Sequence, residues 1–339
     1  MPARRRIGPR LALCGLLLLG AGERLAAEAA PAEEGAEPVV EVPQRQLHRY
    51  PLAEGVDVVG ERQYATAEQA DTLLDIAARH AVGYEEIRRA NPDVDTWLPG
   101  AGAQVTVPTR FILPETPREG IVVNIAEMRL YRYPEGKAVV ETFPVSVGRR
   151  DWSTPLGKTR VTEKITDPVW YPPDSIREEA EARGEALPAK VPPGPDNPLG
   201  HYALLLDLDG YLLHSTNRPW GIGMRATHGC IRLHPQDMAY LFDRIQRGTP
   251  VRIVNQPFKA GWSRQGELFL QAFPAFGGRG AQSRDQRLEM AVDVVEEALG
   301  DRQHRIDGQA LRAAVQDPRG KVRSISRGAP EGPLQLTGP

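Results

Sequence analysis

One short segment of the chain gathers the residue types of nucleophilic catalysis. A histidine, His214, is followed after a glycine-containing spacer by His228, Cys230 and Arg232. If residues 227–232 are extended, the alternation of side chains places His228, Cys230 and Arg232 on one face. Imidazoles and a guanidinium beside a thiol stabilise its thiolate, so we predict a lowered pKa for Cys230. The segment therefore predicts a cysteine nucleophile with a histidine as its acid and base.

The neighbouring residues supply the other parts that acyl transfer requires. Gly229 lets the backbone approach a substrate closely and present N–H groups to an oxyanion. Either histidine can take the thiol proton. We assign that role to His214, because it ends a predicted strand and the backbone carbonyl of Ser215 can fix its tautomer. We expect His228 to shape the pocket and to stabilise the thiolate.

The elements around this segment predict a mainly β domain. The turn sequence Asp209-Gly210 predicts a hairpin between two short runs of β-type residues. Further strands are expected at 121–125, 128–133, 139–147, 203–208 and 211–214. Residues 170–200 are rich in proline and include a short polar helix near 174–184. A connection this long often forms a site or a lid.

The composition restricts the classes of protein to consider. The chain has 339 residues, of which 41% are hydrophobic and 25% charged, so it can bury the cores of about two domains. A net charge of −2 does not indicate the strongly basic surface that is typical of a nucleic-acid-binding protein. The 33 glycines and 31 prolines favour short strands joined by turns over a helical bundle.

The N-terminus predicts export. Arginines precede an apolar run and small residues follow it, which is the anatomy of a signal peptide over 1–27, and a linker is expected over 28–61. The run is too short to span a membrane, so we expect a periplasmic protein with no membrane span once mature. Lipidation of Cys14 is disfavoured by the leucine before it. Removal of the signal leaves Cys230 as a single cysteine, either a reactive thiol or an inert buried one, and its neighbours have to decide between the two.

Residues 62–109 have a pattern of their own, with short helices expected at 71–77 and 84–90 and a strand at 104–108. This stretch resembles a lysin-motif (LysM) module, through Asp71-Thr72-Leu73, an Ala-Asn-Pro at the end of the second helix and a Trp-Leu-Pro-Gly turn. The resemblance implies a small α+β fold of βααβ order that binds the glycan of peptidoglycan. Ala70 stands where that family usually has glycine. A module that only packs is the alternative, and in either case we expect a separate folding unit.

The segment described first resembles the signature of the L,D-transpeptidase catalytic domain, a histidine and a spacer followed by Ser/Thr-His-Gly-Cys. The resemblance continues through Thr154-Pro-Leu-Gly and through residues 192–200, 221–225 and 251–256. It implies a mainly β, sandwich-like catalytic domain over 118–255. It also implies that Cys230 is the acylated nucleophile and His214 the general acid and base.

The same resemblance implies a substrate and an order of steps. Cys230 attacks a peptidoglycan stem peptide at its third residue, releases D-alanine and passes the acyl group to an amine. That amine belongs to a second stem or to a lysine of an outer-membrane lipoprotein. Arg232 is implied on the substrate side of the pocket, and further substrate-binding candidates are Thr227, Arg225 and Asn217. No metal or organic cofactor is required.

Three other functions compete with this one. A zinc site at His214, His228, Cys230 and His234 lacks a paired ligand spacing. A cell-wall cysteine peptidase of the papain type places its cysteine before its histidine, the reverse of the order here. A non-catalytic wall-binding protein leaves an unpaired Cys230 without a role.

The region after residue 255 is read as a partly helical C-terminal extension over 256–339. Aromatic residues between 262 and 276 suggest a last strand, and residues 287–299 carry an amphipathic helical stripe. The tail from Arg319 is expected to be disordered.

Overall fold

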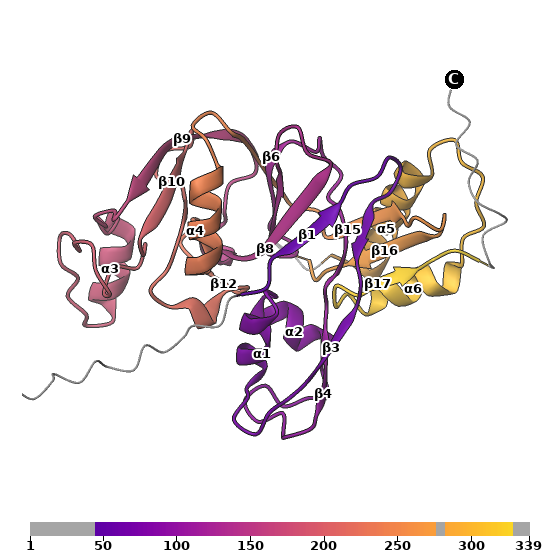
Figure 1. Cartoon of the computed structure of the whole chain (residues 1–339), viewed down its shortest axis with the longest axis horizontal. Coiled ribbons are helices and arrows are strands. Elements are labelled where there is room, and N and C mark those ends of the chain that lie inside the picture. Colours follow the sequence, from indigo (N-terminus) through magenta and orange to yellow (C-terminus); the bar gives the residue numbers. More distant parts are fainter. Residues whose placement is uncertain (1–44, 276–281, 328–339) are drawn as a thin grey trace, which may run out of the picture. The chain divides into compact units, whose positions relative to one another are not determined.

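The β-type runs of the middle of the chain build one large sheet (Figure 1). The structure is a computed structural model that describes residues 45–275 and 282–327. Among these residues the sheet has ten strands in the order β1-β8-β13-β11-β10-β9-β14-β6-β7, and β12 pairs with β8. Because β7 also pairs with β8, the path of strands closes on itself and leaves few free edges. The strands are β1 (His48–Pro51), β6 (Gly120–Asn124), β7 (Arg129–Tyr133), β8 (Val139–Gly148), β9 (Gly157–Thr166), β10 (Tyr202–Leu206), β11 (Leu212–His214), β12 (Arg225–Thr227), β13 (Ile231–Leu233) and β14 (Pro250–Val254).

The apolar side chains of this sheet form the core that carries the site. β8 is buried along nearly its whole length, as expected for a strand that is covered on both faces. Helix α4 (Pro235–Arg244) begins with proline at its first position and packs Met238 and Leu241 into the core. The predicted Asp209-Gly210 hairpin is confirmed, because β10 and β11 pair antiparallel on either side of it.

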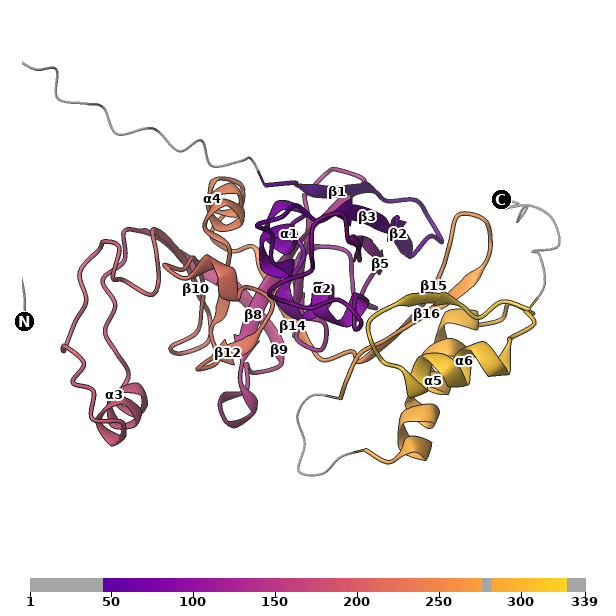
Figure 2. The same ribbon diagram turned by 90° about the horizontal axis from the view of Figure 1, so that it is seen from below.

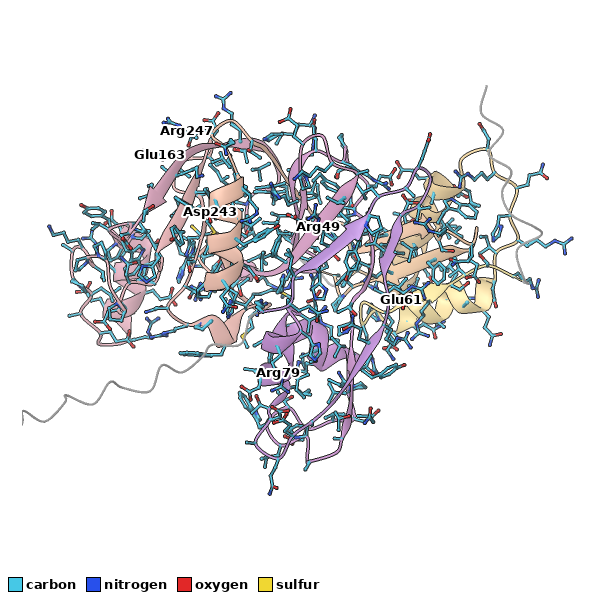
Figure 3. The ribbon with its side chains drawn as sticks, viewed as in Figure 1. Arg49, Glu61, Arg79, Glu163, Asp243 and Arg247 are labelled. Atoms are coloured by element: carbon cyan, nitrogen blue, oxygen red, sulfur yellow. The ribbon has the colours of Figure 1, made fainter. Side chains whose placement is uncertain are left out.

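Residues 63–107 form a small βααβ unit with its own apolar core. It consists of β3 (Gln63–Thr66), α1 (Leu73–Arg79), α2 (Tyr84–Ala90) and β4 (Gln104–Val107), and β3 pairs antiparallel with β4. Thr72 caps α1 in a reciprocal pair with Asp75. Arg79 at the end of α1 donates hydrogen bonds of 2.7 and 2.6 Å to Asp71, which ties the loop before the helix to its last turn (Figure 3).

The linker expected over 28–61 is wrong for the residues near its end. β1 pairs with β8 of the large sheet, and β2 (Val58–Gly60) pairs with β5 (Arg110–Ile112). This segment has little apolar periodicity, but strand pairing is made by backbone groups, and one or two buried side chains such as His48 and Val59 suffice to hold it. Residues 28–44 and the predicted signal peptide lie outside the described residues.

The C-terminal extension contains a second, smaller sheet covered by helices (Figure 2). Strands β15 (Phe258–Trp262), β16 (Leu268–Ala272) and β17 (Val322–Ser324) pair antiparallel, and α5 (Arg284–Leu299) and α6 (Gly308–Gln316) pack against them. The disorder expected from Arg319 is wrong for residues 319–327, because Val322 and Ile325 are buried and β17 completes the sheet. Residues 328–339 lie outside the described part. None of the helices in the described ranges is long and apolar enough to cross a membrane.

Candidate active site

Cys230 lies in a tight bend between two short strands of the large sheet. Thr227, the last residue of β12, donates a 2.6 Å hydrogen bond to the Cys230 carbonyl and accepts one of 3.2 Å from the Gly229 N–H. Thr154 holds the bend from the other side, donating to the Gly229 carbonyl at 2.8 Å and accepting from the Gly148 N–H at 2.9 Å. Two hydroxyl groups therefore fix the backbone on which the thiol stands.

The expected extended conformation over 227–232 is wrong, because the chain turns at Gly229. This residue has a φ of 106°, which favours glycine, and a Cβ here would lie 2.7 Å from a ring atom of Tyr211. A glycine is required both for the backbone angle and for the space. As a result His228, Cys230 and Arg232 do not alternate along one strand.

The thiol of Cys230 is partly buried in this structure. Burial raises the pKa of Cys230, and the opposing effects of the Leu212 backbone and of the Arg232 charge are smaller. The predicted lowering of the Cys230 pKa is therefore wrong for the free protein. The thiol donates a long hydrogen bond of 3.7 Å to the carbonyl of Gly210, so a base has to remove its proton before attack.

His214 lies on β11, next to the strand that follows the nucleophile. β11 and β13 are parallel, and their register sets His214 beside Arg232. Burial, with a smaller effect of the Arg232 charge, lowers the pKa of His214 to about 3, although the backbone of Ser215 and of Leu199 favours the protonated ring. Its buried Nδ1 makes no geometrically satisfactory hydrogen bond within the described part of the chain. His214 is therefore a neutral imidazole, the form that accepts a proton.

The four substrate-binding candidates have different surroundings. Arg232 is partly buried, and its charge acts on Cys230. Asn217 donates a 3.0 Å hydrogen bond to the carbonyl of Pro195, and Thr227 supports the bend. Arg225 donates to the carbonyl of Ala126 at 3.4 Å, and burial lowers its pKa to about 9. The structure thus brings Arg232 to the thiol and gives Asn217 and Thr227 hydrogen bonds to the backbone around it.

Sequence reasoning missed a carboxylate that contacts the catalytic bend. Glu179 lies on α3 (Asp174–Ala182), the polar helix predicted within 170–200, and accepts a 2.7 Å hydrogen bond from His228 Nε2. It also pairs with Arg149 and Arg183. Hydrogen bonds from Arg149 and then from His228 lower the pKa of Glu179 to about 2. Nothing in the local sequence distinguishes it from the other carboxylates of this exposed helix.

A cavity of about 540 Å³ adjoins the nucleophile. Gly210, whose carbonyl accepts the Cys230 hydrogen bond, lines it together with Tyr211 and Leu212, and Leu199 beside His214 lines it as well. Its walls are largely apolar, and Asp207 and Asp209 add carboxylates. A cavity of this size and kind can enclose part of a peptide substrate.

The zinc alternative gains no support from the geometry. Within residues 45–275 and 282–327 no three His, Cys, Asp or Glu side chains gather as a metal site would require. His228 is engaged with Glu179, and His234 accepts a hydrogen bond from the Gln236 N–H at the start of α4. A thiol, a neutral imidazole and a bend rich in backbone N–H groups instead describe acyl transfer.

Comparison with known proteins decides the family. The family model of the YkuD L,D-transpeptidase catalytic domain matches residues 118–253. The chain is 40% identical over 285 residues to the "Probable L,D-transpeptidase ErfK/SrfK" of Escherichia coli (strain K12), a match that covers 83% of this chain and 91% of that relative. This chain belongs to the L,D-transpeptidase family. It is an enzyme, an L,D-transpeptidase, and the matched residues include the bend that carries Cys230.

A second curated relative agrees with this membership. The "Probable L,D-transpeptidase YcfS" of the same E. coli strain is 44% identical over 222 residues, covering 64% of this chain and 69% of the relative. Among solved structures, the catalytic domain of the Enterococcus faecium L,D-transpeptidase matches 41% of this chain and 99% of its own at 23% identity, with a TM-score of 0.32.

Proposed function

We propose that this L,D-transpeptidase acylates Cys230 with a peptidoglycan tetrapeptide stem. The thiol attacks the carbonyl of the third residue while a ring nitrogen of His214 takes its proton. The bond to the terminal D-alanine breaks, and the same proton leaves on the amine of D-alanine. The observation that carries the proposal is the Cys230 thiol, bonded to a residue that lines a peptide-sized cavity, with the neutral imidazole of His214 on the strand that pairs with β13.

The second half of the reaction passes the acyl group to an amine. The amine attacks the thioester carbonyl and gives a proton to His214, the carbon–sulfur bond breaks, and His214 passes that proton to the sulfur. The Gly229 N–H is bonded to Thr227 Oγ1, so the backbone N–H of Cys230 itself is the group of the bend proposed to support the oxyanion in both halves. The acceptor is the diaminopimelate of a second stem or a lysine of an outer-membrane lipoprotein. Mass spectrometry of wall fragments from a deletion strain separates these two products.

A covalent adduct tests the nucleophile directly. Incubation with a carbapenem should add the mass of one inhibitor to the protein, and Cys230→Ala should abolish the gain. Ser153→Ala, a change at an exposed hydroxyl outside the bend, serves as the matched control and should acylate like the wild type. An adduct that persists in Cys230→Ala, or that never forms on the wild type, would refute the assignment.

We infer that the βααβ unit is a LysM-like module that holds the glycan of peptidoglycan. Large hydrophobic side chains are exposed on it at Trp97 (62%), Leu98 (79%) and Tyr64 (62%). Exposed aromatic rings of this kind stack on sugars and mark binding surfaces. Trp97→Ala should weaken retention on insoluble sacculi, whereas Arg88→Ala on the same unit should not. Equal retention of the two variants would make the unit a packing element only.

We also propose that the protein is exported to the periplasm. The arginines and apolar run of residues 1–27 support a signal peptide, and wall peptides are accessible only outside the cytoplasm. Cell fractionation of the full chain, with and without residues 1–27, is the test. Accumulation of both forms in the cytoplasm would contradict export.

A further inference from the structure

The long connection between β9 and β10 is closed at its base and forms a strap beside the site. Trp170 and Val191 exchange backbone hydrogen bonds of 2.9 and 2.8 Å, and Asn197 donates a 2.8 Å hydrogen bond to the carbonyl of Pro168. We call residues 170–191 the strap. Pro168 and Val169, immediately before it, line the cavity beside Cys230. The residues that lead into the base of the strap are thus part of the wall of this cavity.

The helical end of the strap, which we call its tip, is held to the rest of the protein through the side chain of Glu179. In its helix α3 only Ala180 is buried, so apolar packing holds it weakly. Within the described part of the chain, the side-chain hydrogen bonds and ion pairs that join residues 174–185 to the rest of the protein all end on Glu179. The bonds come from Arg149, with Nη1 at 3.0 Å, and from His228, with Nε2 at 2.7 Å.

Both partners of Glu179 lie in segments next to the bend that carries Cys230. Arg149 follows β8, and its N–H donates a 3.0 Å hydrogen bond to the carbonyl of Thr227. His228 directly precedes Gly229, and the ring of Trp152 lies 5.4 Å from its own. A single carboxylate therefore ties the strap to the segments on both sides of the catalytic bend. The groups that face it are Arg149, Arg183 and His228, and the hydrogen bond from Arg149 is the largest cause of its low pKa of about 2, so it stays ionised.

We propose that Glu179 is a positioning residue that fastens the strap and holds His228 and the bend in place. A fastened strap limits access to the thioester and excludes water, which favours transfer to an amine over hydrolysis. Release of Glu179 lets the tip swing from its base and opens the wall of the cavity. The proposal rests on the proposed function only in taking Cys230 as the nucleophile.

Alkylation of Cys230 measures access without requiring any turnover. In a Cys14→Ser background Cys230 is the only thiol of the full chain. We measure the ratio of two alkylation rates of Cys230, the rate with a bulky maleimide over the rate with iodoacetamide. We expect Glu179→Gln to raise this ratio about fivefold, which is the size of effect expected from the loss of a partly exposed ion-pair network. Glu178→Gln, an exposed neighbour on the same helix, is the matched control and should leave the ratio unchanged.

Two further readouts separate fastening from general stability. Trypsin should cleave the strap of Glu179→Gln several times faster after Arg177, Arg183 or Lys190, while the melting temperature stays near that of the wild type. In the transpeptidation assay the hydrolysed fraction of the product should rise, and Glu179→Asp, which keeps the charge, should restore part of the transfer.

Equal alkylation ratios and equal cleavage in Glu179→Gln and Glu178→Gln would overturn the proposal. A lower melting temperature with an unchanged alkylation ratio would also overturn it. Failure of the carbapenem adduct would instead remove only the proposed function.

Discussion

At the residue scale, the two histidines near the thiol have separate tasks. His214 is buried and neutral, whereas His228 donates its Nε2–H to a carboxylate on another segment. A ring already engaged in this way is less free to take the thiol proton. The structure therefore favours His214 as the base and gives His228 a part in holding the bend.

His214→Ala should reduce the rate of Cys230 acylation by about two to four orders of magnitude, the range typical of losing a general acid and base. His228→Ala should cost less, because it removes a support and not the proton acceptor. Stopped-flow measurement of carbapenem acylation compares the two variants. A nearly unimpaired His214→Ala beside a crippled His228→Ala would reverse the two roles.

The pH dependence of thiol reactivity follows from burial. Because burial raises the pKa of Cys230, its alkylation rate should increase with pH and reach half its maximum above the usual range of a cysteine. Arg232→Gln removes a charge that favours the thiolate, so it should move this midpoint to still higher pH. His228→Gln should leave the midpoint in place, because His228 does not contribute to the shift. A lower midpoint in Arg232→Gln would contradict this electrostatic account.

At the element scale, the βααβ unit is joined to the large sheet through buried charges. Arg129 of β7 is fully buried and donates hydrogen bonds of 2.8 and 2.6 Å to Glu86 of α2. The N–H of Tyr84 also donates to the carbonyl of Ile222 at 2.9 Å, in the loop that leads to the catalytic bend. The expectation of two separate folding units is therefore wrong, since removal of the unit strips Arg129 of its partner.

Glu86→Ala should destabilise the whole protein by about 3–5 kcal/mol, because it leaves the Arg129 charge buried and unpaired. Urea unfolding, followed by circular dichroism, measures the free energy of unfolding. Glu85→Ala, next along the same helix, removes only the more exposed pairs with Arg88 and Arg89 and should cost about 1 kcal/mol or less. If the two variants lost equal amounts of unfolding free energy, the buried pair would contribute no more to stability than the exposed pairs.

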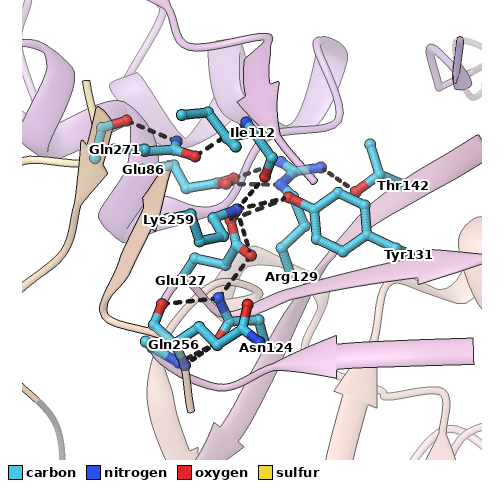
Figure 4. Close-up of polar contacts among 12 residues, drawn as sticks. Glu86, Ile112, Asn124, Glu127, Arg129, Tyr131, Thr142, Gln256, Lys259 and Gln271 are labelled. Atoms are coloured by element: carbon cyan, nitrogen blue, oxygen red, sulfur yellow. Dashed lines mark hydrogen bonds and ion pairs between the residues drawn. The ribbon is translucent and has the colours of Figure 1, made fainter. Parts of the chain in front are cut away.

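At the scale of the whole molecule, the C-terminal extension neutralises a charge in the core of the catalytic region. Lys259 of β15 contacts both carboxylate oxygens of Glu127 at 2.9 and 2.7 Å, and both side chains are almost fully buried (Figure 4). Asn124 and Tyr131 donate to the same carboxylate at 2.9 and 3.1 Å. The extension is therefore part of the folding unit, and a chain cut after residue 255 loses the counter-charge of Glu127.

Lys259→Met should lower the free energy of unfolding by about 3–5 kcal/mol, because it leaves the Glu127 carboxylate buried without its counter-charge. The double variant Glu127→Gln with Lys259→Met removes both charges, keeps an acceptor for Asn124, and should recover most of that loss. Lys137→Met, at an exposed turn, should change stability by less than about 0.5 kcal/mol. A double variant as unstable as Lys259→Met would argue that packing, and not the unpaired charge, explains the loss.

Several features of this protein could be predicted because they depend only on residues that are close together in the sequence. The hairpin at Asp209-Gly210, the helix within 170–200 and the segment that carries Cys230 follow from turn chemistry, periodicity and residue types at short spacing. The turn at Gly229 was missed because the residues around it alternate as in a strand, while Tyr211, just before β11, leaves no room for a side chain at position 229.

Only the tertiary structure decided which distant charges meet. Glu179 and His228 are 49 residues apart, Glu86 and Arg129 are 43 apart, and Glu127 and Lys259 are 132 apart. Their side chains look like ordinary surface charges in the sequence. The last two pairs acquire a role because folding buries them, and an unpaired charge in the protein interior is costly, whereas the partly exposed Glu179 gains its role from the two segments that it joins. The same loss of water raises the pKa of Cys230 and keeps His214 neutral, which no pattern of neighbouring residues could have determined.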